Sequence, residues 1–280
     1  MKYALSLLCL LVFSLGMGQE NREANFPKEE IIVKELPAKE NFWIFVLAGQ
    51  SNMAGRGFVE PVDTIPNPRI LSITKDNQWK IAKEPLNFNE PPLTGLDCGV
   101  SFARTLLDSI PENVTIGLVH TAIGGSAVEQ WVGDLVHKDV KLLTNFKNAV
   151  GFAKQHGVIK GILWHQGESN AQANLVPTYE QKLDALFTIF RTYIENDTLP
   201  IIMGELGNFK RPENQTEPWH AINRIINNYA AKQPYTSIIK TGDLEHKGDD
   251  LHFDSKSQRE MGVRFAKAIS KQILQESRDD

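Results

Sequence analysis

The amino-acid sequence predicts an α/β protein in which a parallel sheet carries helices on both faces. Three observations support this fold class. Short apolar runs recur along the chain, segments with a helical spacing of apolar residues separate them, and polar or glycine-rich clusters directly follow several of the runs. Continuous apolar runs are typical of strands that are buried on both faces, as the strands of a parallel sheet are.

The apolar runs predict five strands. The first, Phe42–Ala48, is a continuous apolar run that stops at Gly49. The other four are Val114–His120, Val158–His165, Leu199–Gly204 and Thr236–Thr241. One insertion interrupts the alternation of strands and helices, because Ile70–Thr74 and Trp79–Ile81 flank turn residues and predict a short hairpin.

Amphipathic patterns between these runs predict helices. Leu143, Phe146, Val150 and Ala153, for example, form one apolar stripe at the spacing of a helix that packs on a sheet. The predicted helices are Val100–Ile110, Val140–His156, Pro177–Ile194, Trp219–Lys232 and Ser255–Leu274. Strands that alternate with helices imply right-handed crossovers and a parallel sheet.

The first 18 residues predict a secretory signal peptide. Lys2 gives a positive start, Ala4–Leu15 is almost entirely apolar, and small residues suitable for cleavage follow. The apolar stretch is shorter than the roughly 20 residues that a membrane-spanning helix needs, so no stable membrane insertion is expected. Residues 19–40 are predicted to be a flexible N-terminal segment and residues 41–280 a single folded domain. The protein is therefore expected to be secreted or periplasmic, in a bacterium.

Composition and charge exclude other classes of protein. Hydrophobic residues make up 41% and charged residues 23% of the chain, as in an ordinary globular protein. The formal net charge is −4 and no basic run with interleaved aromatic residues occurs, so no nucleic-acid partner is expected. Asn113, Asn196 and Asn214 begin glycosylation acceptor patterns, whose use the sequence leaves open.

Polar clusters follow three of the predicted strands. They are Gly49–Asn52, His120–Ser126 and His165–Glu168. Because ligands of open parallel sheets bind at the carboxyl ends of the strands, these clusters are expected to meet at one site.

Ser51, directly after the first strand, is a candidate nucleophile. A serine hydroxyl attacks a carbonyl group when a base removes its proton and N–H donors hold the resulting oxyanion. If a helix starts at Ser51, its unpaired N–H groups face the same space. The alternative interpretation is that Ser51 or Asn52 simply caps a helix.

His252 is the candidate base among the seven histidines. Asp249 precedes it by three residues, so one tight turn can place the carboxylate against the imidazole. Such a carboxylate fixes the tautomer of the imidazole and stabilises its charged form. The alternative interpretation of this spacing is a helix N-terminal turn that carries a surface histidine.

Four motifs occur along the chain in a fixed order. They are GQSNM at 49–53, AIGGS at 122–126 followed by Trp131, WHQGES at 164–169, and DDLHF at 249–253. Together they closely resemble the SGNH hydrolases, and more narrowly the carbohydrate-esterase branch with acetylxylan esterases and sialate O-acetylesterase-like proteins. The resemblance spans about Phe42 to Ala268. It implies a flavodoxin-like three-layer α/β/α sandwich, the SGNH hydrolase fold, whose five parallel strands have the order 2-1-3-4-5.

The resemblance also implies roles for individual residues. Ser51 matches the nucleophile, His252 the general base and Asp249 its orienting acid. The oxyanion donors would be the backbone N–H groups of Ser51 and Gly125 and the side chain of Gln166. The remaining assignments are Glu168 as a supporting or substitute acid, Asn52 and Arg56 as residues that shape the substrate pocket, and Trp131 as a wall for the substrate.

The sequence thus predicts a secreted serine esterase that removes O-acetyl groups from an oligo- or polysaccharide, of acetylxylan or sialic-acid type, through an acetyl-enzyme intermediate. It needs no cofactor, and a metal site is not expected because His165 and Glu168 have no evident third ligand. Two alternatives stay open: an esterase or lipase of the same fold that acts on other acyl esters, and a non-catalytic sugar-binding protein. In the latter, sugars would stack on tryptophans chosen from Trp43, Trp79, Trp131, Trp164 and Trp219.

Overall fold

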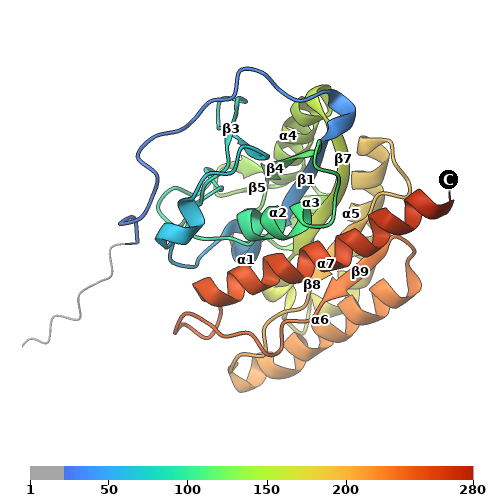
Figure 1. Ribbon diagram of the computed structural model, residues 1–280. Coiled ribbons are helices and arrows are strands. Elements are labelled where there is room, and N and C mark those ends of the chain that lie inside the picture. The colour runs from blue at the N-terminus through green and yellow to red at the C-terminus, as the bar shows by residue number, and fades with distance from the viewer. Residues whose placement is uncertain (1–21, 280) are drawn as a thin grey trace, which may run out of the picture.

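A central sheet forms the middle of the computed structural model, which describes residues 22–279 (Figure 1). Its strands are β1 (Phe42–Gly49), β2 (Ile70–Ile73), β3 (Trp79–Ile81), β4 (Thr115–His120), β7 (Val158–His165), β8 (Ile201–Gly204) and β9 (Thr236–Ile239). They lie in the order β3-β2-β4-β1-β7-β8-β9, and all but β3 run parallel. The predicted signal peptide, residues 1–18, lies outside the described residues.

The five strands that the sequence predicted form most of this sheet. β4, β1, β7, β8 and β9 are neighbours in this order, which is the expected order 2-1-3-4-5. β1 and β7 are buried over most of their length, because helices cover both of their faces. The predicted α/β class and its parallel sheet are therefore confirmed.

The predicted hairpin does not stand apart from the sheet. β2 pairs in parallel with β4, with Ile70 opposite Ile116, and β3 pairs antiparallel with β2 at the edge. The apolar residues of β2 are buried as a result of this pairing. The sheet therefore extends beyond the five strands that the sequence predicted.

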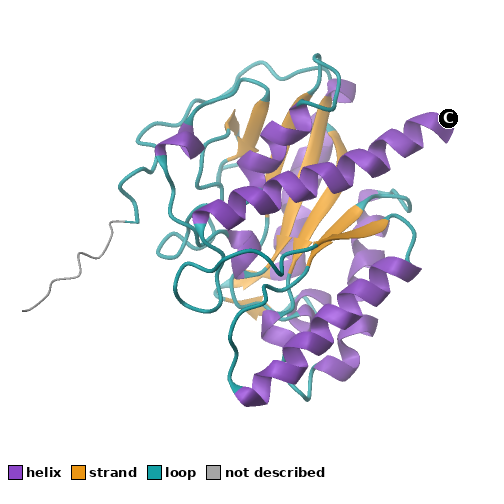
Figure 2. Ribbon diagram, turned by 60° about the horizontal axis from the view of Figure 1, so that its bottom comes forward, coloured by secondary structure: helices purple, strands orange, loops and turns teal. Residues whose placement is uncertain are grey.

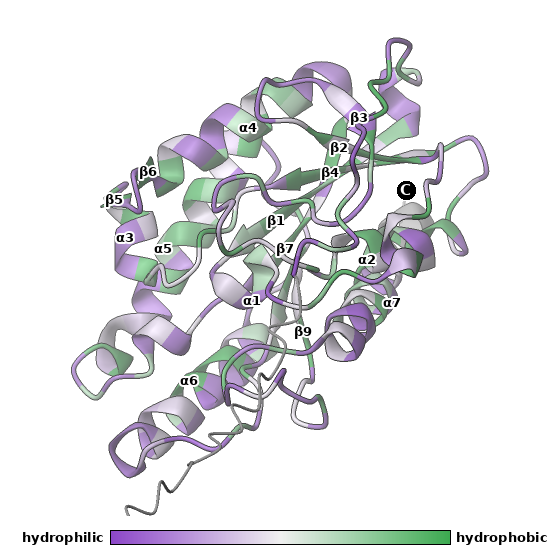
Figure 3. Cartoon of the chain, turned by 90° about the vertical axis from the view of Figure 1, so that its left-hand side faces the viewer, coloured by the Kyte–Doolittle hydropathy of each residue, from purple (hydrophilic) through white to green (hydrophobic). Residues whose placement is uncertain are grey.

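Helices cover the two faces of the sheet and complete three layers (Figure 2). On one face, α2 (Gly99–Leu107) and α7 (Ser255–Asp279) pack against the side of β1 that carries Phe45 and Leu47. The opposite face, with Ile44 and Val46, packs against another set of helices. These are α3 (Val128–Val132), α4 (Leu142–His156), α5 (Val176–Ile194) and α6 (Glu213–Lys232). Apolar residues accordingly concentrate in the central strands (Figure 3).

The ends of the helices follow from local sequence. In α5, Pro177 lies in the first turn, where its missing N–H costs no helical hydrogen bond, and Glu195 ends the helix in a left-handed conformation. One helix is longer than the sequence predicted: α6 begins at Glu213, whereas the predicted helix begins at Trp219. Among residues 22–279, no helix combines the length and the apolar character that a membrane span requires.

The described part of the N-terminal segment, residues 22–40, lies along the sheet edge. The N–H of Val33 donates to the carbonyl of Trp79 at 2.9 Å, and the N–H of Ile81 donates to the carbonyl of Ile31 at 2.9 Å. Ile32 and Lys80 form an antiparallel bridge between these contacts. The sequence predicted a flexible segment here, because the segment is rich in charged residues. That composition gave no indication of the hydrogen bonds with β3. The short 3-10 helix η1 (Lys39–Asn41) then leads into β1.

The strand register brings the polar clusters to one edge of the sheet. Leu47 of β1 lies opposite His120 of β4, and Gly49 lies opposite His165 of β7. The backbone of Gly49 has φ +135°, and an added Cβ would lie 2.1 Å from the carbonyl oxygen of His165, so only glycine fits there. Short helices follow the strands at this edge and beside it: α1 (Ser51–Ala54), η2 (Pro61–Thr64) and η3 (Glu168–Asn170).

Candidate active site

Ser51, His252 and Asp249 meet at the carboxyl edge of the sheet. The Nε2 atom of His252 lies 3.1 Å from the Ser51 hydroxyl oxygen, and its Nδ1 atom lies 2.7 Å from Oδ2 of Asp249. With the Nδ1–H donating to Asp249, Nε2 is free to accept the hydroxyl proton of Ser51. Ser51 is 6% exposed, so its hydroxyl reaches solvent only through the cavity beside it. The arrangement can activate a serine oxygen for attack on an ester.

Asp249 is held by the turn that carries His252. Its Oδ1 atom accepts the backbone N–H of His252 at 2.8 Å and that of Leu251 at 3.1 Å. Burial raises the pKa of the Asp249 carboxyl, but the hydrogen bonds from the backbone and the imidazole of His252 outweigh it and lower the pKa below its ordinary value. The carboxylate is therefore charged when it faces the imidazole.

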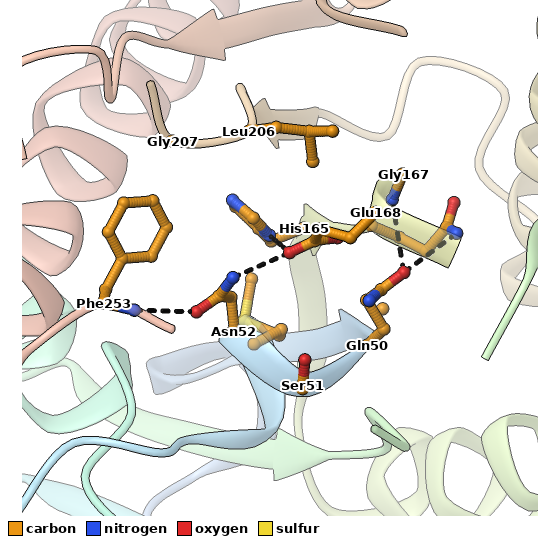
Figure 4. A network of polar contacts seen from close by, with 12 residues as sticks. Gln50, Ser51, Asn52, His165, Gly167, Glu168, Leu206, Gly207 and Phe253 are labelled. Atoms are coloured by element: carbon orange, nitrogen blue, oxygen red, sulfur yellow. Dashed lines mark hydrogen bonds and ion pairs between the residues drawn. The ribbon is translucent and has the colours of Figure 1, made fainter. Parts of the chain in front are cut away.

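Asn52 fixes the His252 loop and does not contact the cavity, which corrects the prediction that it binds substrate. Its Nδ2 atom donates to Glu168 at 2.7 Å and to the carbonyl of Leu251 at 3.1 Å, while its Oδ1 accepts the N–H of Phe253 at 3.0 Å (Figure 4). The side chain is 1% exposed. All its polar atoms are used in joining α1 to the loop of His252.

Glu168 lies beside Asn52 and makes no contact with His252. Its Oε1 atom accepts from Asn52 and is 3.6 Å from Nδ1 of the buried His165. The geometry thus separates the two candidate acids, because only Asp249 touches the imidazole of His252. Among residues 22–279, no group of three His, Cys, Asp or Glu side chains is arranged to hold a metal ion.

Two of the expected oxyanion donors are backbone N–H groups beside the cavity, and the third is the side chain of Gln166. The backbone N–H groups of Ser51 and Gly125 border the cavity and have no acceptor among the described residues. Gly125 lines the cavity and has φ +77°, a conformation that favours glycine. The neighbouring N–H of Gly124 already donates to Glu90 at 2.6 Å. Gly125 is therefore the better placed of the two glycines.

Gln166 does not reach the cavity, which corrects its prediction as the third oxyanion donor. The side chain is fully buried, and its amide nitrogen lies 2.8 Å from Oδ1 of Asn170, 3.2 Å from Oε1 of Gln50 and 3.2 Å from the carbonyl of Ser126. An amide nitrogen has only two hydrogens, and both are engaged by these three acceptors. Gln166 therefore holds loops together beneath the site.

Trp131 is a core residue rather than a wall for the substrate. It is 0% exposed, its indole N–H donates to the hydroxyl of Ser126 at 2.9 Å, and its ring packs edge-on against Trp164 at 5.5 Å. The sequence prediction failed because residues 128–132 form α3, whose inward face carries Trp131. Trp219 is the tryptophan that lines the cavity.

The cavity at the Ser51 hydroxyl has a volume of about 520 Å³. Basic side chains line it more densely than acidic ones do. The basic residues are Arg22, Arg56, Lys138, Arg211 and Lys247, and the acidic ones are Glu168 and Asp249. Four of these basic side chains form ion pairs with Glu23, Glu90 or Asp249, and among the described residues Arg211 alone of the five forms none.

Glu90 anchors one wall of this cavity. It forms ion pairs with Arg56 at 2.9 Å and with Lys138 at 2.6 Å, and Arg56 borders the cavity as the sequence predicted. Burial raises the pKa of the Glu90 carboxyl, but the hydrogen bonds and charges of Lys138 and Arg56, with the N–H of Gly124, lower the pKa below its ordinary value. The charged carboxylate thus stabilises both the wall and the glycine loop.

Replacing Glu90 with Gln is expected to make stability less dependent on pH. Because the pKa is lowered in the folded protein, the stabilisation is full above the ordinary pKa of a glutamate and is lost as pH falls through the lowered value. Leaving Arg56 buried without its partner charge costs about 3 kcal/mol at neutral pH. Melting temperatures measured from pH 7 to pH 3 should show a gap between wild type and variant that closes in acid.

A matched control for this experiment is Glu195→Gln, because Glu195 pairs with Lys154 on the surface and its side chain is 81% exposed. That variant should melt close to the wild type at every pH. A gap for Glu90→Gln that stays constant between pH 7 and pH 3 would contradict the stabilising role of the charged carboxylate.

Three residues of the site received no role from the sequence. Gln50 was seen only as part of the cluster that contains Ser51, and Glu90 and Arg211 belong to the long loops at 82–98 and 205–212. The guanidinium of Arg211 stacks on Trp219 at 4.6 Å and donates to the carbonyl of Asp250 at 2.7 Å, without an ion pair to any described carboxylate. Its position after β8 is the signal that could have revealed it, since ligands bind beyond the carboxyl ends of strands.

Comparison with protein families gives one match over most of the chain. A family model described as "Carbohydrate esterase, sialic acid-specific acetylesterase" matches residues 41–271. Among curated proteins, the chain is similar to a "Probable carbohydrate esterase" of Arabidopsis thaliana, with 27% identity over 247 residues that cover 80% of this chain and 89% of that protein.

Solved structures resemble the whole three-layer domain. The X-ray structure of an Arabidopsis thaliana protein matches with a TM-score of 0.72 and 26% identity, over 83% of this chain and 98% of that one. NanS matches with a TM-score of 0.67 and 19% identity, over 88% of this chain and 100% of that one. A "novel carbohydrate acetylesterase" from Xanthomonas citri matches with a TM-score of 0.62 and 22% identity, over 81% of this chain and 54% of that one.

Proposed function

This chain belongs to the sialic acid-specific acetylesterase family of carbohydrate esterases, with the fold of the SGNH hydrolases, and from this premise we propose that it deacetylates a sugar by a serine mechanism. It is a carbohydrate O-acetylesterase, an ester hydrolase. The observation that carries the serine mechanism is the line of contacts from Ser51 through His252 to Asp249, at 3.1 Å and 2.7 Å.

In the proposed reaction, the hydroxyl oxygen of Ser51 bonds to the acetyl carbon while its proton passes to Nε2 of His252. The carbonyl oxygen becomes an oxyanion that accepts the N–H groups of Ser51 and Gly125. The bond from the acetyl carbon to the sugar oxygen then breaks, and that oxygen takes the proton from His252. A water molecule repeats the attack on acetyl-Ser51, and acetate leaves. Asp249 keeps the imidazole in the required tautomer throughout.

The proposed substrate is an O-acetylated acidic sugar of the sialic-acid type rather than acetylated xylan. The guanidinium of Arg211 at the cavity supports this choice, because it donates to the carbonyl of Asp250 and to Gln215 but forms no ion pair with a described carboxylate. A sugar carboxylate would satisfy such a fork with charge-assisted hydrogen bonds. The main chain of xylan is neutral and offers Arg211 no partner.

Hydrolysis rates of O-acetylated sialic acid, acetylated xylan, acetylated pectin and an octanoyl ester, measured side by side as the acetate or octanoate released, test the substrate class. The sialic-acid substrate should have the highest kcat/KM. Preference for the octanoyl ester would support an esterase or lipase for other acyl groups. Sugar binding without any ester turnover would indicate a non-catalytic sugar-binding protein and contradict the proposal.

Replacing Arg211 with Gln is expected to raise KM for O-acetylated sialic acid about 10-fold to 100-fold, because a charge-assisted hydrogen bond to the carboxylate is lost. Hydrolysis of 4-nitrophenyl acetate, which has no carboxylate, should change little. The matched control is Arg224→Gln, since Arg224 lies in α6, the helix that follows the loop of Arg211, and forms an exposed ion pair with Glu217. An equal loss on both substrates for the Arg211 variant would rule out carboxylate recognition.

The proposed enzyme acts outside the cytoplasm, as the signal-like sequence of the first 18 residues suggests. N-terminal sequencing of the protein recovered from an expressing bacterium tests whether the chain is exported and its first 18 residues removed. The mature chain should begin close to Gln19 and should be found in the periplasm or the medium. A chain that retains residues 1–18 in the cytoplasm would contradict export.

A further inference from the structure

The hairpin of β5 (Val136–His137) and β6 (Val140–Lys141) places His137 against the loop that carries Gly125. The two strands lie beside α3 (Figure 3), and His137 belongs to none of the four sequence motifs. Its Nε2 atom lies 3.0 Å from the carbonyl oxygen of Gly124. That carbonyl and the N–H of Gly125 belong to the same peptide group, so His137 contacts the peptide that carries an oxyanion donor.

The glycine loop is a tight turn with this peptide at its centre. The N–H of Ser126 donates to the carbonyl of Ile123 at 3.3 Å, and of the two residues between them only Gly125 has a positive φ, +77°. These are the features of a type II turn, and a type I turn differs from it chiefly in the two dihedral angles that flank the central peptide. A rotation of that one peptide by about half a turn therefore interconverts the two types, and glycine after it permits both.

The orientation of the central peptide decides whether the N–H of Gly125 serves the active site. In a trans peptide the C=O and N–H bonds point in opposite directions. Because the carbonyl of Gly124 faces His137, the N–H of Gly125 points away from the hairpin. Gly125 lines the cavity, and its N–H has no acceptor among residues 22–279. After a half-turn, a carbonyl oxygen would replace this N–H and would repel an oxyanion.

The hydrogen bonds around His137 determine where its proton lies. The Oε1 atom of Gln130 accepts the N–H of Ala127 at 2.8 Å, which fixes the orientation of the Gln130 amide. The NH₂ group of Gln130 therefore faces Nδ1 of His137, at 3.3 Å. Because an N–H group needs a lone pair opposite it, Nδ1 is an acceptor and the proton lies on Nε2. The neutral imidazole thus donates to the carbonyl of Gly124.

The hairpin also holds the glycine loop through Glu90. The Oε2 atom of Glu90 accepts the N–H of Gly124 at 2.6 Å, and its Oε1 pairs with Lys138 at 2.6 Å. Lys138 and Asp139, the two turn residues of the hairpin, have φ of +49° and +63°, which residues other than glycine adopt at a cost. The strained turn therefore places His137 and Lys138 on either side of Gly124.

We propose that His137 is a positioning residue of the oxyanion site, whose Nε2–H holds the peptide between Gly124 and Gly125 in the orientation that presents the N–H of Gly125 to the reacting ester. This inference rests on the proposed serine esterase function. As negative charge grows on the acetyl oxygen, an N–H that is already oriented stabilises it without reorganisation. The hydrogen bond from Gln130 to His137 and that from His137 to Gly124 polarise one another, which strengthens both.

The test replaces His137 with Leu and, separately, with Gln. Leu removes the donor, whereas Gln places an amide N–H near the position of Nε2. His137→Leu is expected to lower kcat for 4-nitrophenyl acetate about 10-fold to 100-fold, because the released peptide turns and the oxyanion loses a donor for part of the time. KM should change less. Affinity for methylboronic acid, whose adduct on Ser51 places an oxygen at the oxyanion position, should fall with kcat, and His137→Gln should recover most of both losses.

His156→Leu is the matched control. His156 is also half-buried, and its Nδ1 lies 3.1 Å from the carbonyl of Phe152 at the end of α4, near the start of β7 and at the opposite edge of the sheet from the site. Its kcat and boronate affinity should stay within a few-fold of the wild type. The inference is overturned if His137→Leu keeps its kcat and its boronate affinity, or if a folded His137→Gln is as impaired as His137→Leu.

The tautomer of His137 gives a readout that does not depend on activity. In protein labelled with ¹⁵N at histidine, the signals that disappear in His137→Gln belong to His137. Above about pH 8, where an ordinary imidazole is neutral, these signals should show a proton on Nε2 and a bare Nδ1. A proton on Nδ1 would leave Nε2 without a hydrogen for the carbonyl of Gly124. That result overturns the inference even if His137→Leu fails to fold.

The Ser51→Ala variant separates this inference from the function on which it rests. If Ser51→Ala abolishes hydrolysis while His137→Leu keeps the kcat of the wild type, only the role of His137 fails. If Ser51→Ala stays active, the serine mechanism itself fails, and the positioning role fails with it.

Discussion

Replacing Ser51 with Ala is expected to lower kcat for an O-acetylated sugar by at least about 10⁴-fold. Among residues 22–279, the Ser51 hydroxyl is the oxygen that hydrogen-bonds with Nε2 of His252, so without it no acetyl-enzyme can form. The fold should persist, because alanine fits the first position of α1 and the hydroxyl, within the described part of the chain, hydrogen-bonds with His252 alone. Acetate release and the melting temperature, measured on the same preparation, check both statements.

Ser169→Ala is the matched control for this experiment. Ser169 lines the same cavity, and its hydrogen bonds with Gln50 and Gln172 use its backbone N–H and carbonyl rather than its hydroxyl. The control should keep kcat within a few-fold of the wild type. Residual activity of Ser51→Ala comparable to that of the control would show that the nucleophile lies elsewhere. Mass spectrometry offers an independent readout, since an organophosphonate ester should label Ser51 in the wild type and not in Ser51→Ala.

Replacing Asp249 with Asn is expected to lower kcat by about 10⁴-fold, with little change in melting temperature. Asn keeps an oxygen that can accept the N–H groups of Leu251 and His252, so the turn should persist. It loses the charge that holds the proton on Nδ1, so the imidazole no longer presents a free Nε2 to Ser51. Turnover of 4-nitrophenyl acetate at neutral pH measures the effect.

Glu168→Gln separates the two acids that the sequence left open. Glu168 contacts Asn52 and lies 3.6 Å from His165, without touching His252. Its replacement should therefore cost less than about 10-fold in kcat, and its main effect should be on the stability of the His252 loop. If Glu168→Gln costs more in kcat than Asp249→Asn, Glu168 is the acid that supports the base, and the assignment of Asp249 is wrong.

The arrangement of the strands could be predicted because it depends on local patterns. Runs such as Phe42–Ala48 are apolar throughout, and only a strand covered on both faces buries such a run. Parallel connections then place the carboxyl ends of β1, β4 and β7 at one edge, and with them the clusters that begin at Gly49 and His165. The hairpin at 70–81 was predicted as well, but its pairing with β4 was not, because that pairing depends on a partner that is remote in sequence.

The roles of single polar side chains could not be predicted in this way. Asn52 and Gln166 carry the same amide group as Gln50, and the sequence offers no reason to give one a place at the cavity and the others a place beneath it. Their partners decide, and those partners lie far along the chain, as with Asn52 and Phe253 or Gln50 and Ser169. Trp131 was likewise assigned to the cavity wall, but the structure places it on the inward face of α3, where it is buried in the core.

The sequence by itself determined the parallel sheet and the edge at which Ser51 lies, because the burial of apolar runs and the handedness of crossovers are properties of short segments. The order of the central strands followed from the resemblance of its motifs to a known family. Only the tertiary structure decided which donors and charges face the cavity. That decision depends on how the loops at 82–98, 205–212 and 246–253 fold over the sheet edge, and on whether each buried amide or guanidinium finds its hydrogen-bond partner inside the protein or leaves a hydrogen for the ligand.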